Sequence, residues 1–173
     1  MKNKNILFFL TGLVLIGMVA NSCKKDDQTP IQTLFTTGSW QLASVIVYHY
    51  LGGSQVGLPD TLNTNCGFTQ MFTFPTNNTC TYTNYHCVQQ SANGTWSLTH
   101  DQLFLEVKIT CTDTVPGNPS ATMPAHPFIY TKILSLGQYS MVLQTGDIGA
   151  YYTTTTKRTI YQYGFVRQKA ASN

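Results

Sequence analysis

The chain has 173 residues, a formal net charge of +3 and only 10% charged side chains. This weak charge lacks the strongly basic character of nucleic-acid-binding domains, so we expect no nucleic-acid partner. Threonine, tyrosine, asparagine and glutamine are abundant, as is typical of half-buried pleated surface rather than of helices or disorder. The composition therefore predicts an all-β protein of about one domain.

The N-terminal segment has the layout of an export signal. Lys2 and Lys4 precede an apolar run over residues 6–20. At roughly 15 residues the run is short for a membrane span, which needs about 20, so cleavage is favoured. The residues leading into Cys23 resemble the lipobox of bacterial lipoproteins, whose cysteine is lipidated and begins the mature chain. The resemblance implies a signal peptide over residues 1–22 and a lipid anchor at Cys23.

Cleavage would leave 151 residues, with eight basic against seven acidic side chains. Residues 23–34 are expected to form a lipidated polar tether, residues 35–169 the folded domain and residues 170–173 a tail. The sequence KKDD over residues 24–27 resembles a tag that sends some Gram-negative lipoproteins to the cell surface; the alternative is a plain solvated tether. The expected location is the outer membrane, facing either the periplasm or the outside.

Eight segments alternate as β-strands do. They are residues 39–51, 68–74, 80–86, 95–99, 102–109, 128–136, 139–144 and 157–168. Tight turns favour antiparallel neighbours, and an even-stranded meander can close and remove its edges. We therefore expect an eight-stranded antiparallel up-and-down barrel. Residues 112–127 hold four of the seven prolines and are expected to form an irregular loop.

Four further cysteines, an even number in an exported chain, predict disulfides. If the hairpin turn centres between residues 76 and 77, Cys66 faces Cys87, which leaves Cys80 with Cys111. Pairing Cys66 with Cys111 would force the other two to bond along one strand, across roughly 23 Å, whereas a disulfide needs Cα atoms within about 7 Å. A free, nucleophilic Cys80 is the alternative, disfavoured by export into an oxidising compartment.

Several short motifs occur in a characteristic order. Gly38, Ser39 and Trp40 open the first strand, one cysteine precedes a Phe-x-Phe strand and another follows its hairpin, and then come GTWSL (94–98) and LSL (134–136). This order resembles the lipocalin-like domain of bacterial lipoproteins and covers residues 34–168. The resemblance implies a lipocalin-like barrel in which Arg167, from the last strand, packs across Trp40 of the first.

The inward face of the predicted barrel is rich in aromatic side chains. Strict alternation from Trp40 places Leu42, Ser44, Ile46, Tyr48 and Tyr50 on one side. The candidate ligand-binding residues are Tyr48, Tyr50, Phe72, Phe74, Tyr161 and Tyr163. They could line a pocket for a small hydrophobic or amphipathic ligand. They could equally be the packed core of a barrel with no ligand, because aromatic files with period two fill any barrel.

Two functions follow from these observations. The first is a membrane-anchored surface lipoprotein whose barrel binds a small apolar or amphipathic ligand. The second is a protein-interaction module, such as a hydrolase inhibitor or an accessory subunit of an outer-membrane complex, that uses residues 52–65, 112–127 and 145–155. A cavity open at one end would favour the first, and a filled barrel with an aromatic-bearing loop surface would favour the second.

Residues suited to catalysis or metal binding form no pattern. The four histidines, His49, His86, His100 and His126, lie on different predicted elements. Glu106 is alone on a strand face, and the aspartates of the domain fall in predicted loops or turns. The sequence contains no Gly-x-Ser-x-Gly elbow, phosphate loop or dinucleotide fingerprint. We expect no enzymatic activity, cofactor or metal.

Overall fold

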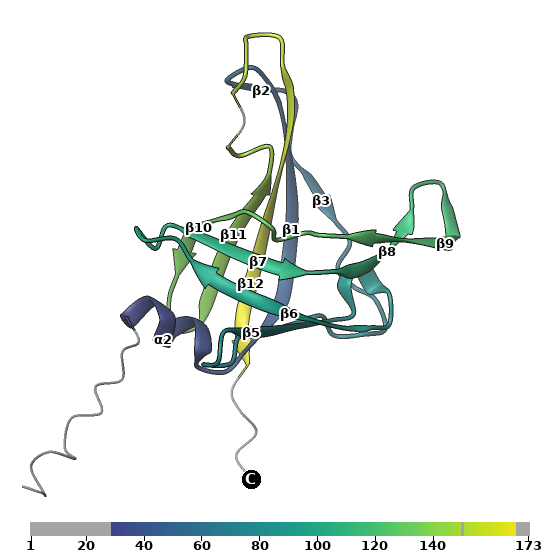
Figure 1. Cartoon of the computed structure of the whole chain (residues 1–173). Helices are drawn as coiled ribbons and strands as arrows, with labels where there is room; N and C mark the ends of the chain where they lie inside the picture. The colour runs from purple at the N-terminus through teal and green to yellow at the C-terminus, as the bar shows by residue number, and fades with distance from the viewer. Residues whose placement is uncertain (1–28, 150, 169–173) are drawn as a thin grey trace, which may run out of the picture.

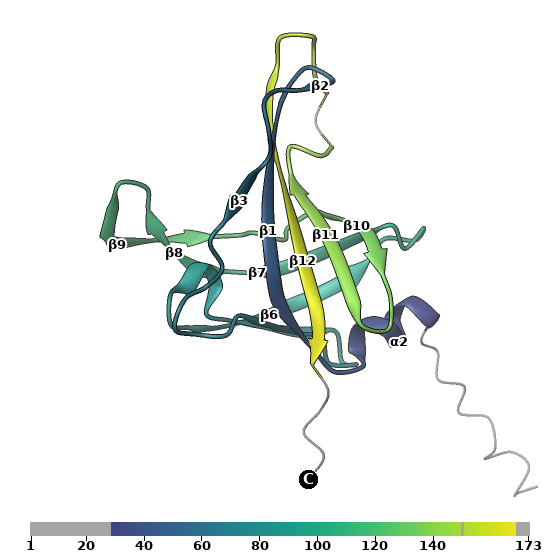
Figure 2. The same ribbon diagram turned by 180° about the vertical axis from the view of Figure 1, so that it is seen from behind.

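The computed structural model describes residues 29–149 and 151–168, which form a closed, eight-stranded antiparallel β-barrel (Figures 1 and 2). In spatial order its strands are β1 (Ser39–Leu51), β4 (Met71–Thr73), β5 (Thr79–Thr83), β6 (Ser91–Leu98), β7 (Phe104–Ile109), β10 (Thr131–Leu136), β11 (Ser140–Gly146) and β12 (Lys157–Gln168). Strand β12 returns to pair with β1. The predicted fold class is confirmed.

Shorter elements decorate the barrel. Strands β2 (Ser54–Gln55) and β3 (Asp60–Leu62) pair with the outer part of β1. Strands β8 (Cys111–Val115) and β9 (Asn118–Ala125) form a separate hairpin that projects from the barrel in Figure 1. The expectation of an irregular loop over residues 112–127 is therefore wrong. Pro119 and Pro124 are tolerated because β9 pairs with β8 alone among the described strands, and an edge strand can lack a donor.

A short helix, α2 (Pro30–Thr36), closes one end of the barrel. The hydroxyl of Thr29 accepts the N–H of Gln32, whose side chain accepts the N–H of Thr29, a capping box that starts the helix. Its Phe35 is fully buried, and its carbonyl accepts the indole N–H of Trp40 at 3.1 Å. The folded domain thus begins inside the expected tether. No helix in the described part of the chain is long and apolar enough to cross a membrane.

Closure of the barrel joins β1 to β12. Trp40 is paired with Arg167, and the guanidinium carbon lies 4.5 Å from the centre of the indole ring. The same guanidinium donates to the carbonyl of Leu34 in α2. Desolvation lowers the pKa of Arg167, but an arginine stays charged, so the cation–π contact persists. The predicted contact between Trp40 and Arg167 is confirmed.

A β-bulge in β1 changes which residues face inward. The register with β12 shifts between Leu42 and Ser44, and Ala43 is left exposed. One extra residue reverses the alternation beyond it, so Val45 and Val47 enter the core in place of Ser44, Ile46, Tyr48 and Tyr50. The expected inward file on β1 is correct only as far as Leu42.

Aromatic rings fill the barrel from α2 upward. Neighbouring centroids are 5.2 Å apart for Phe35 and Phe74, 4.2 Å for Phe74 and Phe72, 5.0 Å for Phe72 and Phe128, and 5.1 Å for Phe128 and Tyr163. All five are buried, and burial of each phenylalanine contributes roughly 2 to 3 kcal/mol. The closed half of the barrel is packed core.

The cysteines divide into one disulfide and two thiols. Cys66 is bonded to Cys87, as predicted, with Cα atoms 5.6 Å apart. Cys80 and Cys111 are both buried and free, so the second predicted disulfide is not formed. Cys80 is paired in the sheet with Gly94, which is paired with Ile109 of β7, so a whole strand separates the two cysteines.

We expect Arg167→Met to reduce the free energy of unfolding by about 1 to 2 kcal/mol, because it removes the cation–π contact and the hydrogen bond to α2. Urea denaturation measures the change. Lys157→Met on the exposed start of β12 is the matched control, with an expected change within about 0.5 kcal/mol. Equal stability of the two variants would show that the Trp40 contact does not stabilise closure.

Burial raises the pKa of Cys80 to about 11 and that of Cys111 to about 12. At about pH 8 roughly one Cys80 in a thousand is ionised, so a thiol-disulfide reagent should not react with the folded protein. With Cys23→Ser, Ellman's reagent should detect no thiol in the native chain and two after guanidinium unfolding. If the reagent detects no thiol in the unfolded, unreduced chain, the result would instead establish a second disulfide, between Cys80 and Cys111.

Candidate functional site

The end of the barrel opposite α2 is hollowed. Along β12, Tyr161 lies six residues from Arg167, which corresponds to roughly 20 Å of strand. A hollow of about 380 Å³, here called the larger hollow, opens at that level. Its lining consists of Tyr85, His86, Asp113, His126, Pro127, Ile129, Tyr130, Thr145, Gly146, Tyr161 and Tyr163. Aromatic and apolar surface with a few polar groups is the usual make-up of a small-molecule site.

A smaller hollow of about 240 Å³ lies beside the first, where β1 parts from β4. It is lined by Leu42, Val45, Leu62, Asn63, Thr64, Gln70, His86, Cys87, Asp113 and Thr114. His86 and Asp113 belong to both linings. This pair therefore forms the boundary between the two hollows.

His86 and Asp113 are hydrogen-bonded, with Nδ1 and Oδ2 2.9 Å apart. Both side chains are largely shielded, at 32% and 22% exposure. Because a carboxylate only accepts, Nδ1 of the neutral ring carries the hydrogen and Nε2 is left as an acceptor. That Nε2 is buried and has no hydrogen-bond partner among the described residues.

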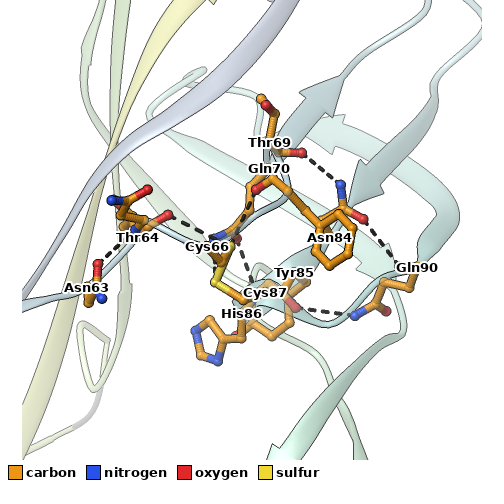
Figure 3. Close-up of a disulfide and its surroundings, with 12 residues drawn as sticks. Asn63, Thr64, Cys66, Thr69, Gln70, Asn84, Tyr85, His86, Cys87 and Gln90 are labelled. Carbon is orange, nitrogen blue, oxygen red and sulfur yellow. Dashed lines mark hydrogen bonds between the residues drawn. A yellow bond between two sulfur atoms is a disulfide. The ribbon is translucent and has the colours of Figure 1, made fainter.

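The backbone around His86 is held in a rare conformation. Asn84, His86 and Cys87 have φ of 58°, 47° and 66°, in the left-handed region that favours glycine. Such residues cost about 1 kcal/mol or more each and persist only where the surroundings fix them. Here Cys87 is bonded to Cys66, and the ring of His86 stacks on Tyr85 at 4.1 Å (Figure 3).

Two glutamine side chains fix the pair from either side. Gln90 accepts the N–H of Thr112 and donates to its carbonyl, both at 2.6 Å, and also donates to the carbonyl of Tyr85. This ties the start of β8, and with it Asp113, to η1 (Tyr85–Cys87). The buried Gln70 accepts the backbone N–H of His86 at 3.2 Å. The disulfide and these amides hold the pair in a fixed geometry.

The larger hollow carries little charge. Burial raises the pKa of Tyr163 to about 12 and that of Tyr85 further, so both phenols keep their protons. None of the described residues that line either hollow is a lysine or an arginine. When the imidazoles are neutral, the carboxylate of Asp113 is the one formal charge in the lining.

The six candidate ligand-binding residues separate into three groups. Tyr161 and Tyr163 line the larger hollow, as expected. Phe72 and Phe74 belong to the packed core instead, because Phe35 and Phe128 cover them. Tyr48 and Tyr50 lie beyond the bulge and line neither hollow. The ring of Tyr50 lies 5.2 Å from the guanidinium carbon of Arg158.

The structure adds His86, Asp113, Gln70 and Gln90 to the site. Sequence reasoning placed Asp113 in a loop, because the prolines of that segment concealed the hairpin. One usable signal was the position of His86 directly before Cys87, the cysteine already predicted to be fixed by a disulfide. A second pair, His49 with Asp60 at 3.0 Å, lies on β1 and β3, is well exposed and lines neither hollow.

In the described ranges, histidine, cysteine and carboxylate side chains gather in no group of three that could hold a metal. No nucleophile is hydrogen-bonded to Nε2 of His86 there. Comparison of the sequence with protein-family models and with curated proteins gave no match. The site has to be interpreted from its own geometry.

Proposed function

We propose that this protein is a lipid-anchored, lipocalin-like carrier or receptor that binds one small amphipathic molecule in the larger hollow. The observation that carries the proposal is the division of the barrel into a packed half below Tyr163 and an open, tyrosine-lined half above it. A volume of about 380 Å³ suits a ligand of one or two rings. A long acyl chain does not fit, because rings occupy the barrel axis.

The lipid anchor enters the proposal through the sequence. Cys23 and the preceding segment lie outside the described residues, so lipidation and outer-membrane location, facing the periplasm or the cell surface, stay predictions. From Cys23 to Pro30 the chain can extend at most about 25 Å. Since α2 closes the barrel at this end, a lipidated Cys23 would keep the closed end near the membrane and direct the hollows away from it (Figure 1).

A protein partner is the second candidate. The outer parts of β1 and β12 extend beyond the barrel as an arm, and the loops there expose Leu58 at 89% and Tyr151 fully. Arg158 holds the arm together by donating to the carbonyl of Gly52 and packing 3.7 Å over the ring of Tyr152.

Leu58→Ser with Tyr151→Ser should abolish capture of such a partner without changing binding in the larger hollow.

We expect the neutral two-ring fluorophore prodan to bind the mature protein, and Ile129→Trp to weaken binding by roughly fivefold or more. Ile129 lines the larger hollow and is 64% exposed, so a larger ring can fill the hollow without disturbing the core. Leu134→Trp, at an exposed position outside both hollows, is the matched control. Fluorescence titration that finds no binding, or equal binding by both variants, would refute the proposed site.

The anchor is tested separately by Cys23→Ser. Loss of the acylated side chain should move the protein from the membrane fraction to the soluble fraction, since acyl chains bind a bilayer by about 0.8 kcal/mol for each buried methylene. Fractionation and intact mass measure the change. Membrane attachment that persists in the variant would refute lipidation at Cys23, while the barrel and its hollow would be unaffected.

A further inference from the structure

We infer that the larger hollow selects an organic ammonium ion, a primary or secondary amine carried on an apolar or aromatic body. This inference rests on the proposed function, because it names the chemical class of the ligand at the same site. It follows from three features of the lining: its charge, its aromatic faces and its unused hydrogen-bond acceptor.

Charge is the first feature. Asp113 brings a carboxylate to the hollow, and the lining contains neither lysine nor arginine to oppose it. Its partner His86 donates Nδ1–H at 2.9 Å, which orients the carboxylate without cancelling its charge as long as the imidazole is neutral. An anionic ligand would meet a like charge in this shielded place, whereas an ammonium ion would meet its complement.

Aromatic faces are the second feature. Tyr85, Tyr130, Tyr161 and Tyr163 all contribute to the lining, although one face of Tyr85 is covered by His86 and one face of Tyr130 by Phe104. The negative faces of tyrosine rings attract cations within about 6 Å, most strongly where water is excluded. This protein already uses that interaction elsewhere, with Arg167 over Trp40 and with Arg158 over both Tyr152 and Tyr50. In the larger hollow four tyrosines stand without a cation from the described chain.

The unused acceptor is the third feature. Nε2 of His86 is buried without a partner in the described part of the chain, and in the neutral ring it can only accept. Because Nε2 is buried, a ligand N–H can pair with it only when the imidazole ring shifts, and that pairing removes the cost of leaving a buried polar atom unpaired. An ammonium group with N–H bonds combines this donor with the positive charge. A quaternary ammonium has no N–H donor, and a carboxylate has neither the N–H donor nor the positive charge.

Three probes of nearly equal size test the inference: 2-phenylethylammonium, 2-phenylethanol and phenylacetate. Titrations of the mature protein at about pH 8, where imidazoles are neutral and the amine is charged, give their relative affinities by calorimetry or NMR shifts. We expect the ammonium probe to bind about tenfold more tightly than the alcohol, and phenylacetate to bind more weakly than either.

Asp113→Asn removes the charge but keeps the shape of the side chain and an acceptor for His86. It should lower the affinity for the ammonium probe by about tenfold and change that for the alcohol by less than about threefold. Asp60→Asn is the matched control, because Asp60 also pairs with a histidine but lies outside the hollows. Asp60→Asn changes the net charge by the same amount as Asp113→Asn and should leave the affinities for all three probes unaltered.

The outcomes separate the two proposals. Equal or tighter binding of the alcohol or of phenylacetate by the wild-type protein would overturn ammonium selectivity while leaving a ligand site in the hollow. An equal loss of ammonium affinity in both variants would also overturn it, because the effect would then come from net charge. Binding of none of the probes, nor of the neutral fluorophore, would remove the proposed function itself. The relative affinities of the wild-type protein for the three probes test ammonium selectivity even if Asp113→Asn fails to fold.

Discussion

The antiparallel pairing of β1 with β12 is the constraint on which the rest of this structure depends. It closes the sheet, so that the described barrel strands leave no long unpaired edge, and it runs the full length of β1. At its base, the Arg167 guanidinium joins the Trp40 ring to the Leu34 carbonyl of α2. The Arg167 side chain thereby links the pairing that closes the barrel to the helix α2 that covers its end.

That closed end determines what the other end can do. Phe35 enters the barrel from α2, and a continuous stack of rings extends from it to Tyr163. The depth that a lipocalin-like barrel could offer a long apolar ligand is therefore occupied by side chains. The remaining space lies above Tyr163, beside a His86–Asp113 pair that a disulfide and two glutamines hold in place. In the function proposed above, ligand size and ligand chemistry are thus set by different parts of the same barrel.

The sequence predicted the features that depend on period and register. The strand order and the Cys66–Cys87 bond follow from alternation within strands and facing positions across them, whereas the contact of Arg167 with Trp40 was implied by the family resemblance. Features created by a single irregular residue were not predictable in this way. The extra residue at Ala43 reversed the outer half of β1. The left-handed backbone at Asn84 ended the predicted strand over residues 80–86 early, so that its last residues lie in η1.

The contact between His86 and Asp113 was missed for a related reason. His86 and Asp113 are 27 residues apart and meet only because η1 and the β8–β9 hairpin both depart from regular barrel geometry. The proline-rich sequence of the hairpin indicates a loop when it is considered alone. Only the tertiary hydrogen bonds of Gln90, which join Thr112 to Tyr85, place the carboxylate beside the ring. No local pattern encodes those contacts.

Methyl-selective NMR of the mature protein during titration with 2-phenylethanol tests most directly whether ligands bind above the packed core. The methyl groups of Ile129 line the larger hollow, whereas those of Leu105 and Leu143 are fully buried in the barrel. We expect saturable shifts at Ile129 with little change at the two leucines. Shifts of similar size at Leu105 and Leu143, or no shift at Ile129, would contradict it.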